Sequence, residues 1–122
     1  MTTSEKATVL AWHDALNARD FDTLIELSSD DIEVGDAAGA AQGHAALRNW
    51  ASTQALTVTP GRLFIRDGVV VVDQQIADAD GKPSASASAF RVVHDKVTSV
   101  FRHDDLASAL AATELTEADA TS

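Results

Sequence analysis

Hydrophobic positions near the start of the chain repeat with the period of an α-helix. Val9, Trp12 and Leu16 recur at i, i+3 and i+7, which predicts an amphipathic helix over roughly residues 4–18. Such a stripe faces the core of a globular protein, so we expect Trp12 to be buried. His13 follows Trp12 and could face either inward or outward.

Two further helices are predicted in the first half of the chain. Asp20 is a suitable N-cap for a short helix that carries Leu24 and Leu27. Gly43 and His44 open a third helical pattern. Its apolar positions fall on one face: Leu47, Trp50 and Ala51.

Between these last two helices the period changes to that of a strand. Ile32, Val34 and Asp36 fall on one face, and the small residues of 37–43 indicate a loop or a short irregular hairpin. Asp36 therefore directs a carboxylate toward apolar surroundings. Burial without a cation raises the pKa of a carboxyl group and makes it a competent general base near neutral pH. In the alternative, the strand ends one residue earlier and Asp36 begins a solvated turn.

The second half of the chain is predicted to form strands joined by hairpins. Turns are indicated by Asp67-Gly68, Asp80-Gly81 and Asp95-Lys96, while Pro60-Gly61 suits an edge strand or a bulge. The strand patterns cover residues 57–66, 69–76, 84–94 and 97–104.

This order of elements predicts an α+β fold in a single domain, residues 1–115, with the helices on one face of the sheet. Residues 105–115 are expected to form a short closing helix, and the polar tail, residues 116–122, is expected to fray. The other face of the sheet is rich in valine and needs a cover. In so small a protein a second copy is the expected cover, so we predict a homodimer through the sheet.

Charge and composition narrow the range of partners. Nineteen acidic against nine basic residues give a net charge of −10, which disfavours nucleic acid and anionic membranes. The chain has no cysteine, no glycine-rich phosphate loop and no histidine pair with zinc-ligand spacing, so we expect no metal and no cofactor. It also has neither a secretion signal nor a membrane-spanning apolar run, which makes a cytoplasmic location the expectation.

One long segment resembles a known superfamily. The run WHDALNARDFDTLIELSSDDIEVGDAAG, residues 12–39, is similar to the opening of nuclear transport factor two-like proteins, among them the SnoaL-like proteins and the bacterial steroid Δ-isomerases. Residues 43–50 and the segment Phe90-Arg91-Val92 continue the likeness. The resemblance implies a cone-shaped, curved antiparallel sheet wrapped by N-terminal helices, as in cystatin-like folds, and a small-molecule pocket inside the cone.

The resemblance also implies roles for three residues. Asp36 falls where the isomerases keep the carboxylate that carries a proton between carbons. Trp12 replaces their oxyanion-hole tyrosine, and Ser88 replaces a protonated aspartate. Indole N–H and serine O–H groups still donate hydrogen bonds, although less acidic ones. The residues predicted to contact a ligand are Trp12, Leu16, Val34, Trp50, Phe90, Arg102 and Asp104.

Two strand patterns leave alternatives open. Ser84, Ser86 and Ser88 share one face of their strand, and alternating alanines share the other. If the serines face into the cone they leave room for a ligand, an orientation that the resemblance favours; otherwise they are solvated or lie at a subunit contact. Arg102 and Asp104 are two positions apart, so they share a face of the predicted last strand. They form either a site with Asp36, as in the epoxide hydrolases of this superfamily, or a surface ion pair.

Two hypotheses of function follow. In the first, the cone binds a small, apolar, carbonyl-bearing molecule, and Asp36 moves one proton in an isomerisation, cyclisation or dehydration. In the second, the chain is a non-catalytic dimer that binds a lipophilic ligand or another protein. Epoxide hydrolysis is a further alternative.

Overall fold

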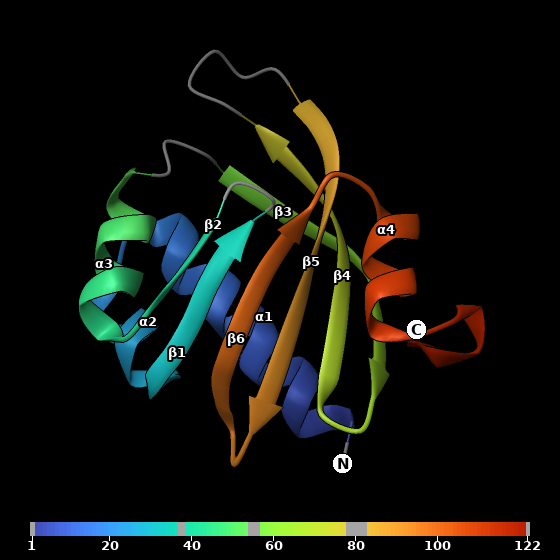
Figure 1. Ribbon diagram of the computed structural model, residues 1–122, viewed down its shortest axis with the longest axis horizontal. Coiled ribbons are helices and arrows are strands. Elements are labelled where there is room, and N and C mark those ends of the chain that lie inside the picture. The colour runs from blue at the N-terminus through green and yellow to red at the C-terminus, as the bar shows by residue number, and fades with distance from the viewer. Residues whose placement is uncertain (1, 37–38, 54–56, 78–82, 122) are drawn as a thin grey trace.

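The computed structural model describes residues 2–36, 39–53, 57–77 and 83–121. Helices α1 (Thr2–Ala18), α2 (Phe21–Glu26) and α3 (His44–Thr53) come from the first half of the chain, together with strands β1 (Ser28–Asp36) and β2 (Gly39–Gln42). The second half supplies β3 (Thr57–Arg66), β4 (Val69–Ala77), β5 (Pro83–Val93), β6 (Lys96–His103), helix α4 (Leu106–Thr113) and the short strand β7 (Ala120–Thr121). The predicted α+β architecture is confirmed (Figure 1).

The strands form one curved sheet in the order β2-β1-β6-β5-β4-β3-β7. Its neighbours are antiparallel except β1 and β6, which run parallel. The prediction of an antiparallel sheet is therefore wrong at this one seam. No hairpin joins β1 to β6, because α3 and the other strands lie between them in the chain, so no tight turn fixes their relative direction.

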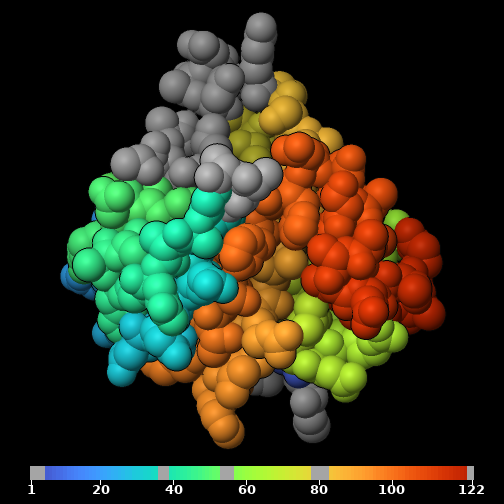
Figure 2. All heavy atoms as spheres, viewed as in Figure 1, coloured from blue at the N-terminus to red at the C-terminus, as the bar shows by residue number. Residues whose placement is uncertain are grey.

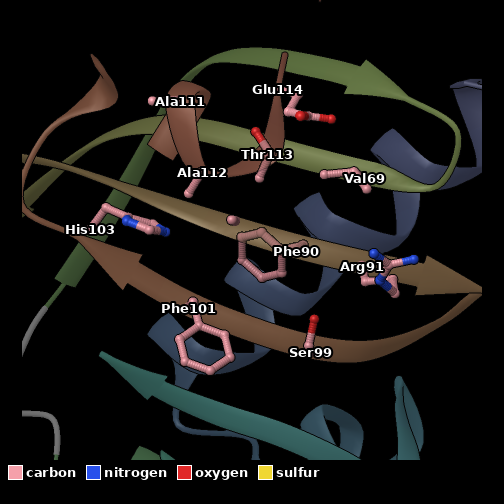
Figure 3. A pocket seen from close by; sticks show the side chains of 11 residues that line it. Val69, Phe90, Arg91, Ser99, Phe101, His103, Ala111, Ala112, Thr113 and Glu114 are labelled. Atoms are coloured by element: carbon pink, nitrogen blue, oxygen red, sulfur yellow. The ribbon is translucent and has the colours of Figure 1, made fainter. Parts of the chain in front are cut away.

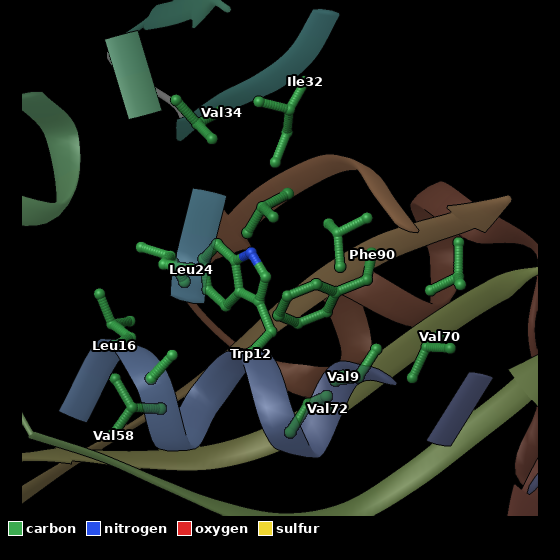
Figure 4. Packing of buried hydrophobic residues seen from close by; sticks show 14 of the residues in the cluster. Val9, Trp12, Leu16, Leu24, Ile32, Val34, Val58, Val70, Val72 and Phe90 are labelled. Atoms are coloured by element: carbon green, nitrogen blue, oxygen red, sulfur yellow. The ribbon is translucent and has the colours of Figure 1, made fainter. Parts of the chain in front are cut away.

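Helix α1 lies across the inner face of the sheet, as its hydrophobic stripe predicts (Figure 1). Val9, Trp12 and Leu16 are all buried in the main core. The inner layer also contains Phe90 of β5, whose ring faces the Trp12 indole (Figure 4). Asn17 fastens the end of α1, because its amide donates to the Val58 carbonyl (2.7 Å) and accepts from the Val58 N–H (2.9 Å).

Helix α4 packs on the opposite, outer face of the sheet. Asp105 caps it by accepting from the Ser108 N–H at 2.7 Å. A second, smaller core lies between α4 and the strands: Phe64, Val71, Ala87, Ala109 and Leu115. Helix α4 therefore covers part of the outer face of the sheet, for which the sequence predicts a second subunit as the cover.

The C-terminal tail, predicted to fray, contains a short 3-10 turn and a two-residue strand that ends at Thr121. Thr116 and Asp119 form a capping box around a short 3-10 turn, and β7 then pairs with Leu63 and Phe64 of β3. Arg62 adds an ion pair with Glu117 at 2.5 Å. The tail is polar in sequence, but its backbone finds partners along the free edge of β3, and composition alone does not reveal such an edge.

The predicted turn chemistry agrees with the structure at Pro60-Gly61 and Asp67-Gly68, but the turn predicted at Asp95-Lys96 lies one residue earlier, at His94 and Asp95, which both have positive φ. The β3–β4 pairing shifts register between Pro60 and Leu63, so this segment is a bulge. Asp67 and Gly68 both have positive φ in the hairpin that follows. The turn predicted at residues 80–81 lies outside the described residues.

No helix in the described ranges is long and apolar enough to cross a membrane.

Candidate functional site

Aromatic side chains fill the cone between α1 and the sheet. Trp12 is 1% exposed and meets the edge of Phe90 at a ring distance of 5.4 Å. The ring of Trp50, on α3, lies 6.1 Å from the Trp12 ring. The indole N–H of Trp12 donates to Ser28 Oγ at 3.1 Å, and Ser28 donates in turn to the Leu24 carbonyl at 2.8 Å. A ligand that takes a hydrogen bond from Trp12 must therefore replace Ser28.

His13 points inward beside Trp12 and is only 2% exposed. Its Nδ1 lies 3.0 Å from the Val9 carbonyl, and its Nε2 lies 3.4 Å from Oε1 of Gln74. Burial lowers the pKa of His13 below its usual value of 6.5 because the charged ring loses hydration; hydrogen bonds to Val9 and Gln74 and the nearby Asp14 act against this, and Arg102 adds to it. The ring is therefore neutral at pH 7.

Gln74 and two serines continue this polar chain across the sheet. The Gln74 amide is buried on β4, and its Nε2 donates to Ser86 Oγ at 3.0 Å and to Ser88 Oγ at 2.8 Å on β5. The serine face of β5 thus points into the cone, while Ala87 and Ala89 face α4. Four polar side chains, His13, Gln74, Ser86 and Ser88, are thus joined in a largely apolar interior, where each must find partners to offset lost hydration.

Arg102 brings the cationic group of the site. It lies opposite Ser88 in the β5–β6 register, and its guanidinium stacks 5.4 Å from the Trp50 ring centre. Asp104 does not accompany it, because β6 ends at His103 and Asp104 lies exposed in the bend that follows. The predicted arginine–aspartate pair on one strand face is therefore wrong.

The remaining predicted residues are brought together in part. Leu16 and Val34 belong to the same core as Trp12 and Phe90, and Trp50 packs against it. Asp36 ends β1, where it pairs with Gly39 in the hairpin. Its side chain lies outside the described residues, so its role stays a prediction.

Sequence reasoning left His13 undecided and missed Gln74 altogether. The signals were present for both. His13 lies four residues after Val9 and three before Leu16, which puts it on the edge of the buried stripe. Gln74 continues the alternation of Val70 and Val72 on the inner face of its strand. A polar residue that continues a buried apolar face indicates a hydrogen-bonded partner inside.

A pocket of about 560 Å³ lies on the outer face, not in the cone (Figure 3). It opens between α4 and strands β5 and β6, and Figure 2 shows these strands set back beside α4 on this side of the molecule. Its lining residues include Ala89, Arg91, Ser99, Phe101, His103 and Ala112. A smaller hollow of about 140 Å³ lies at the β3 bulge and is lined by residues of β3 and β4, Gln74 among them.

Within the described ranges, no three His, Asp or Glu side chains gather in a way that could hold a metal ion.

The fold and the polar, aromatic-lined cone define a class of protein, the α+β cone proteins with one wrapped interior. Comparison with family models makes this assignment more specific. Residues 9–105 match the SnoaL-like domain, and because this match covers most of the chain, the protein belongs to the SnoaL-like domain family. A search of curated proteins finds no match.

Solved structures share the fold at low sequence identity. An NTF2-like protein of unknown function from Cytophaga hutchinsonii is 18% identical, with a TM-score of 0.75 over 83% of this chain and 89% of that one. A proposed polyketide cyclase from Sinorhizobium meliloti is 19% identical (TM-score 0.73; 80% and 94%). A proposed ketosteroid isomerase from Kribbella flavida is 17% identical (TM-score 0.74; 82% and 76%). At these identities the likeness establishes the fold alone.

Proposed function

We propose that this protein binds a small, largely apolar molecule inside the cone and contacts an oxygen of that molecule through Ser88 and Arg102. The observation that carries the proposal is the chain of buried polar groups from His13 through Gln74 to Ser88, which ends opposite Arg102. A core that needed only stability would be better filled by apolar side chains. The aromatic walls Trp12, Trp50 and Phe90 suit an apolar ligand body.

The proposed reaction is the transfer of one proton by Asp36, in an isomerisation, cyclisation or dehydration without cofactor. The guanidinium of Arg102 would stabilise negative charge that develops on a carbonyl oxygen, as the best-placed donors of such sites do. The proposed cyclase and isomerase among the structural neighbours make this chemistry the natural first test.

A second candidate function is a non-catalytic dimeric binding module, and the outer pocket favours it. Helix α4 leaves part of β5 and β6 uncovered there, and a second copy could use this uncovered part. Sedimentation at micromolar concentration tests the dimer: a species twice the mass of the 12.8 kDa chain is expected, and a clean monomer would exclude it.

The binding proposal is tested with cyclohex-2-enone and 1-decalone as probes, observed by NMR. We expect the indole N–H signals of Trp12 and Trp50 to shift on titration, because both rings line the cone. Arg102→Met should weaken binding at least tenfold, since a charged hydrogen bond contributes about 1.5–3 kcal/mol. Arg91→Met removes the same charge from the next strand on the outer side and is the matched control. Equal losses in both variants, or shifts confined to the outer pocket, would refute binding in the cone.

A further inference from the structure

The hydrogen-bond chain of the cone contains a conflict that depends on one proton. The Val9 carbonyl only accepts hydrogen bonds, so the hydrogen of the neutral His13 ring lies on Nδ1. Its Nε2 is then a lone pair, and it faces Oε1 of Gln74, which is also an acceptor. Two acceptors in contact are unfavourable in a buried site.

Exchange of the oxygen and nitrogen of the Gln74 amide removes this conflict. The amide nitrogen then donates to Nε2 of His13, and the amide oxygen accepts the hydroxyl hydrogens of both Ser86 and Ser88. The heavy-atom positions stay the same, because an amide turned by half a revolution occupies nearly the same space. In this arrangement Ser88 keeps only lone pairs for any further partner.

Protonation of His13 selects the opposite arrangement. Nε2 now carries a hydrogen and donates to Oε1 of Gln74, and the two hydrogens of the amide nitrogen go to Ser86 and Ser88, at 3.0 and 2.8 Å. The serine oxygens then accept hydrogen bonds from Gln74, so their own hydroxyl hydrogens are no longer used within the chain of hydrogen bonds. The hydroxyl of Ser88 can then donate its hydrogen to a ligand oxygen.

We propose that His13, Gln74 and Ser88 form a proton-linked switch that sets whether the cone receives a hydrogen-bond acceptor or a donor. A ligand carbonyl or carboxylate at Ser88 is bound together with a proton on His13, while a ligand hydroxyl that donates to Ser88 is bound with His13 neutral. The inference rests on the proposed function for the place of the ligand, but the switch itself exists without one.

The charges around His13 are consistent with such a balance. Asp14, next to it on α1, favours the protonated ring, and Arg102 of β6 opposes it. Val58 of β3, Gln74 of β4 and Phe90 of β5, which belong to this layer, are neutral. A bound anion beside Arg102 would offset that arginine's effect and ease protonation of the ring.

The switch predicts a definite pH dependence of binding. A ligand that requires the protonated state loses about tenfold in apparent affinity for each pH unit above the pKa of His13, because the competent fraction falls by that factor. A donor ligand shows no such loss and weakens instead below that pKa.

NMR titration of the unliganded chain tests the switch directly. At neutral pH we expect ¹⁵N shifts of a His13 ring protonated on Nδ1. As the pH falls, the side-chain amide signals of Gln74 should shift with the same midpoint as the His13 ring. A hydrogen on Nε2 at neutral pH, or Gln74 signals that stay constant while His13 titrates, would overturn the proposal.

Matched ligands then test the selectivity. Binding of cyclohexanone and of cyclohexanol is measured by NMR on both sides of the His13 midpoint. We expect the ketone to be favoured below it and the alcohol above it. In Gln74→Met, which breaks the chain but leaves both ends, this opposite dependence should disappear. Equal pH dependence of both ligands in the natural chain refutes the selectivity. Failure of both to bind refutes the cone as their site, while the ligand-free titration still decides the switch.

Discussion

The two faces of the sheet are built for different purposes. On the inner face, Trp12 of α1 packs against Phe90 of β5 in a core that is almost entirely closed to solvent. The hydrogen-bonded chain from His13 through Gln74 to Ser88 is embedded in that core. The outer face is covered by α4, with its small alanine side chains, and only in part. A pocket of about 560 Å³ remains beside that helix.

The contrast shows that an open pocket and a set of oriented polar groups are two different indications of a binding site. The outer pocket is large, and its polar side chains are exposed or half-buried: Arg91, Ser99, His103, Thr113 and Glu114. On the inner face, the polar groups of His13, Gln74, Ser86 and Ser88 are oriented by buried hydrogen bonds. Orientation is the property that recognition requires, so the inner face is the better candidate.

Replacement of one phenylalanine on each face by alanine should give the largest difference in stability between the two faces. Phe90 and Phe101 lie on neighbouring strands but on opposite faces. Phe90→Ala should lower the free energy of unfolding by about 3–5 kcal/mol, because it leaves a cavity in a closed core. Phe101→Ala, at the edge of the outer pocket, should cost about 1 kcal/mol. Chemical denaturation measures both, and equal losses would show that the two faces are packed alike.

Removal of the tail should weaken the outer layer by an intermediate amount. A chain ended after Leu115 loses the pairing of β7 with Leu63 and Phe64 and the ion pair of Arg62. We expect a loss of about 1–2 kcal/mol, mostly from backbone hydrogen bonds, since exposed ion pairs contribute little. The NMR signals of the cone should stay in place. An unchanged denaturation midpoint would mean that the tail frays, as its composition suggests.

Acidification should reveal the buried histidine of the inner layer. The folded pKa of His13 is lowered by burial, so protonation opposes folding. Its penalty is absent above the unfolded value of about 6.5, grows as the pH falls toward the folded pKa and is constant below it. The slope is at most about 1.4 kcal/mol per pH unit. His13→Leu should remove this slope, whereas Leu16→Ala should lower stability without changing it.

A lower pH window belongs to the helix caps. Hydrogen bonds from Thr23 hold the pKa of Asp20 below 3.8, and those from Ser108 do the same for Asp105. The stability that these caps contribute is therefore present above pH 3.8 and lost as the pH falls through their folded pKa values. A slope between pH 6.5 and 4 that persists in His13→Leu would contradict the assignment to His13.

The smallest expected effect concerns Asp36. If it is a base in apolar surroundings, Asp36→Asn should raise stability at pH 7 by about 1 kcal/mol or less, since it removes a charge that opposes folding. The gain should shrink toward pH 3.5, and any proton transfer should be abolished. Denaturation at both pH values measures this. An equal or lower midpoint at pH 7 would refute the buried base.

The fold followed from sequence because its signals are local. The stripe of Val9, Trp12 and Leu16, the cap at Asp20 and the turn at Asp67-Gly68 each depend on neighbouring residues, and each agrees with the structure. The parallel seam between β1 and β6 depends on segments far apart in sequence, where no local rule applies.

The site was predicted less completely for a related reason. Trp12, Phe90 and Ser88 face inward as expected. The helical stripe predicts this for Trp12, whereas for Ser88 and Phe90 the alternation left both faces open and the resemblance favoured the inner one. The partner of a polar group is a matter of tertiary distance, so the link from His13 to Gln74 could not be read from spacing. Asp104 failed as a prediction because β6 ends one residue too early, and strand ends are the least certain part of a pattern.

The parallel seam also bears on how the chain is made. Strand β1 is synthesised early, but its partner β6 begins only 60 residues after β1 ends, and Lys96 of β6 binds the carbonyl of Glu26, 70 positions away. During translation β1 therefore leaves the ribosome before the strand that pairs with one of its edges has been made. Contacts of such long range slow folding, and an unpaired strand edge is prone to aggregation until its partner is in place.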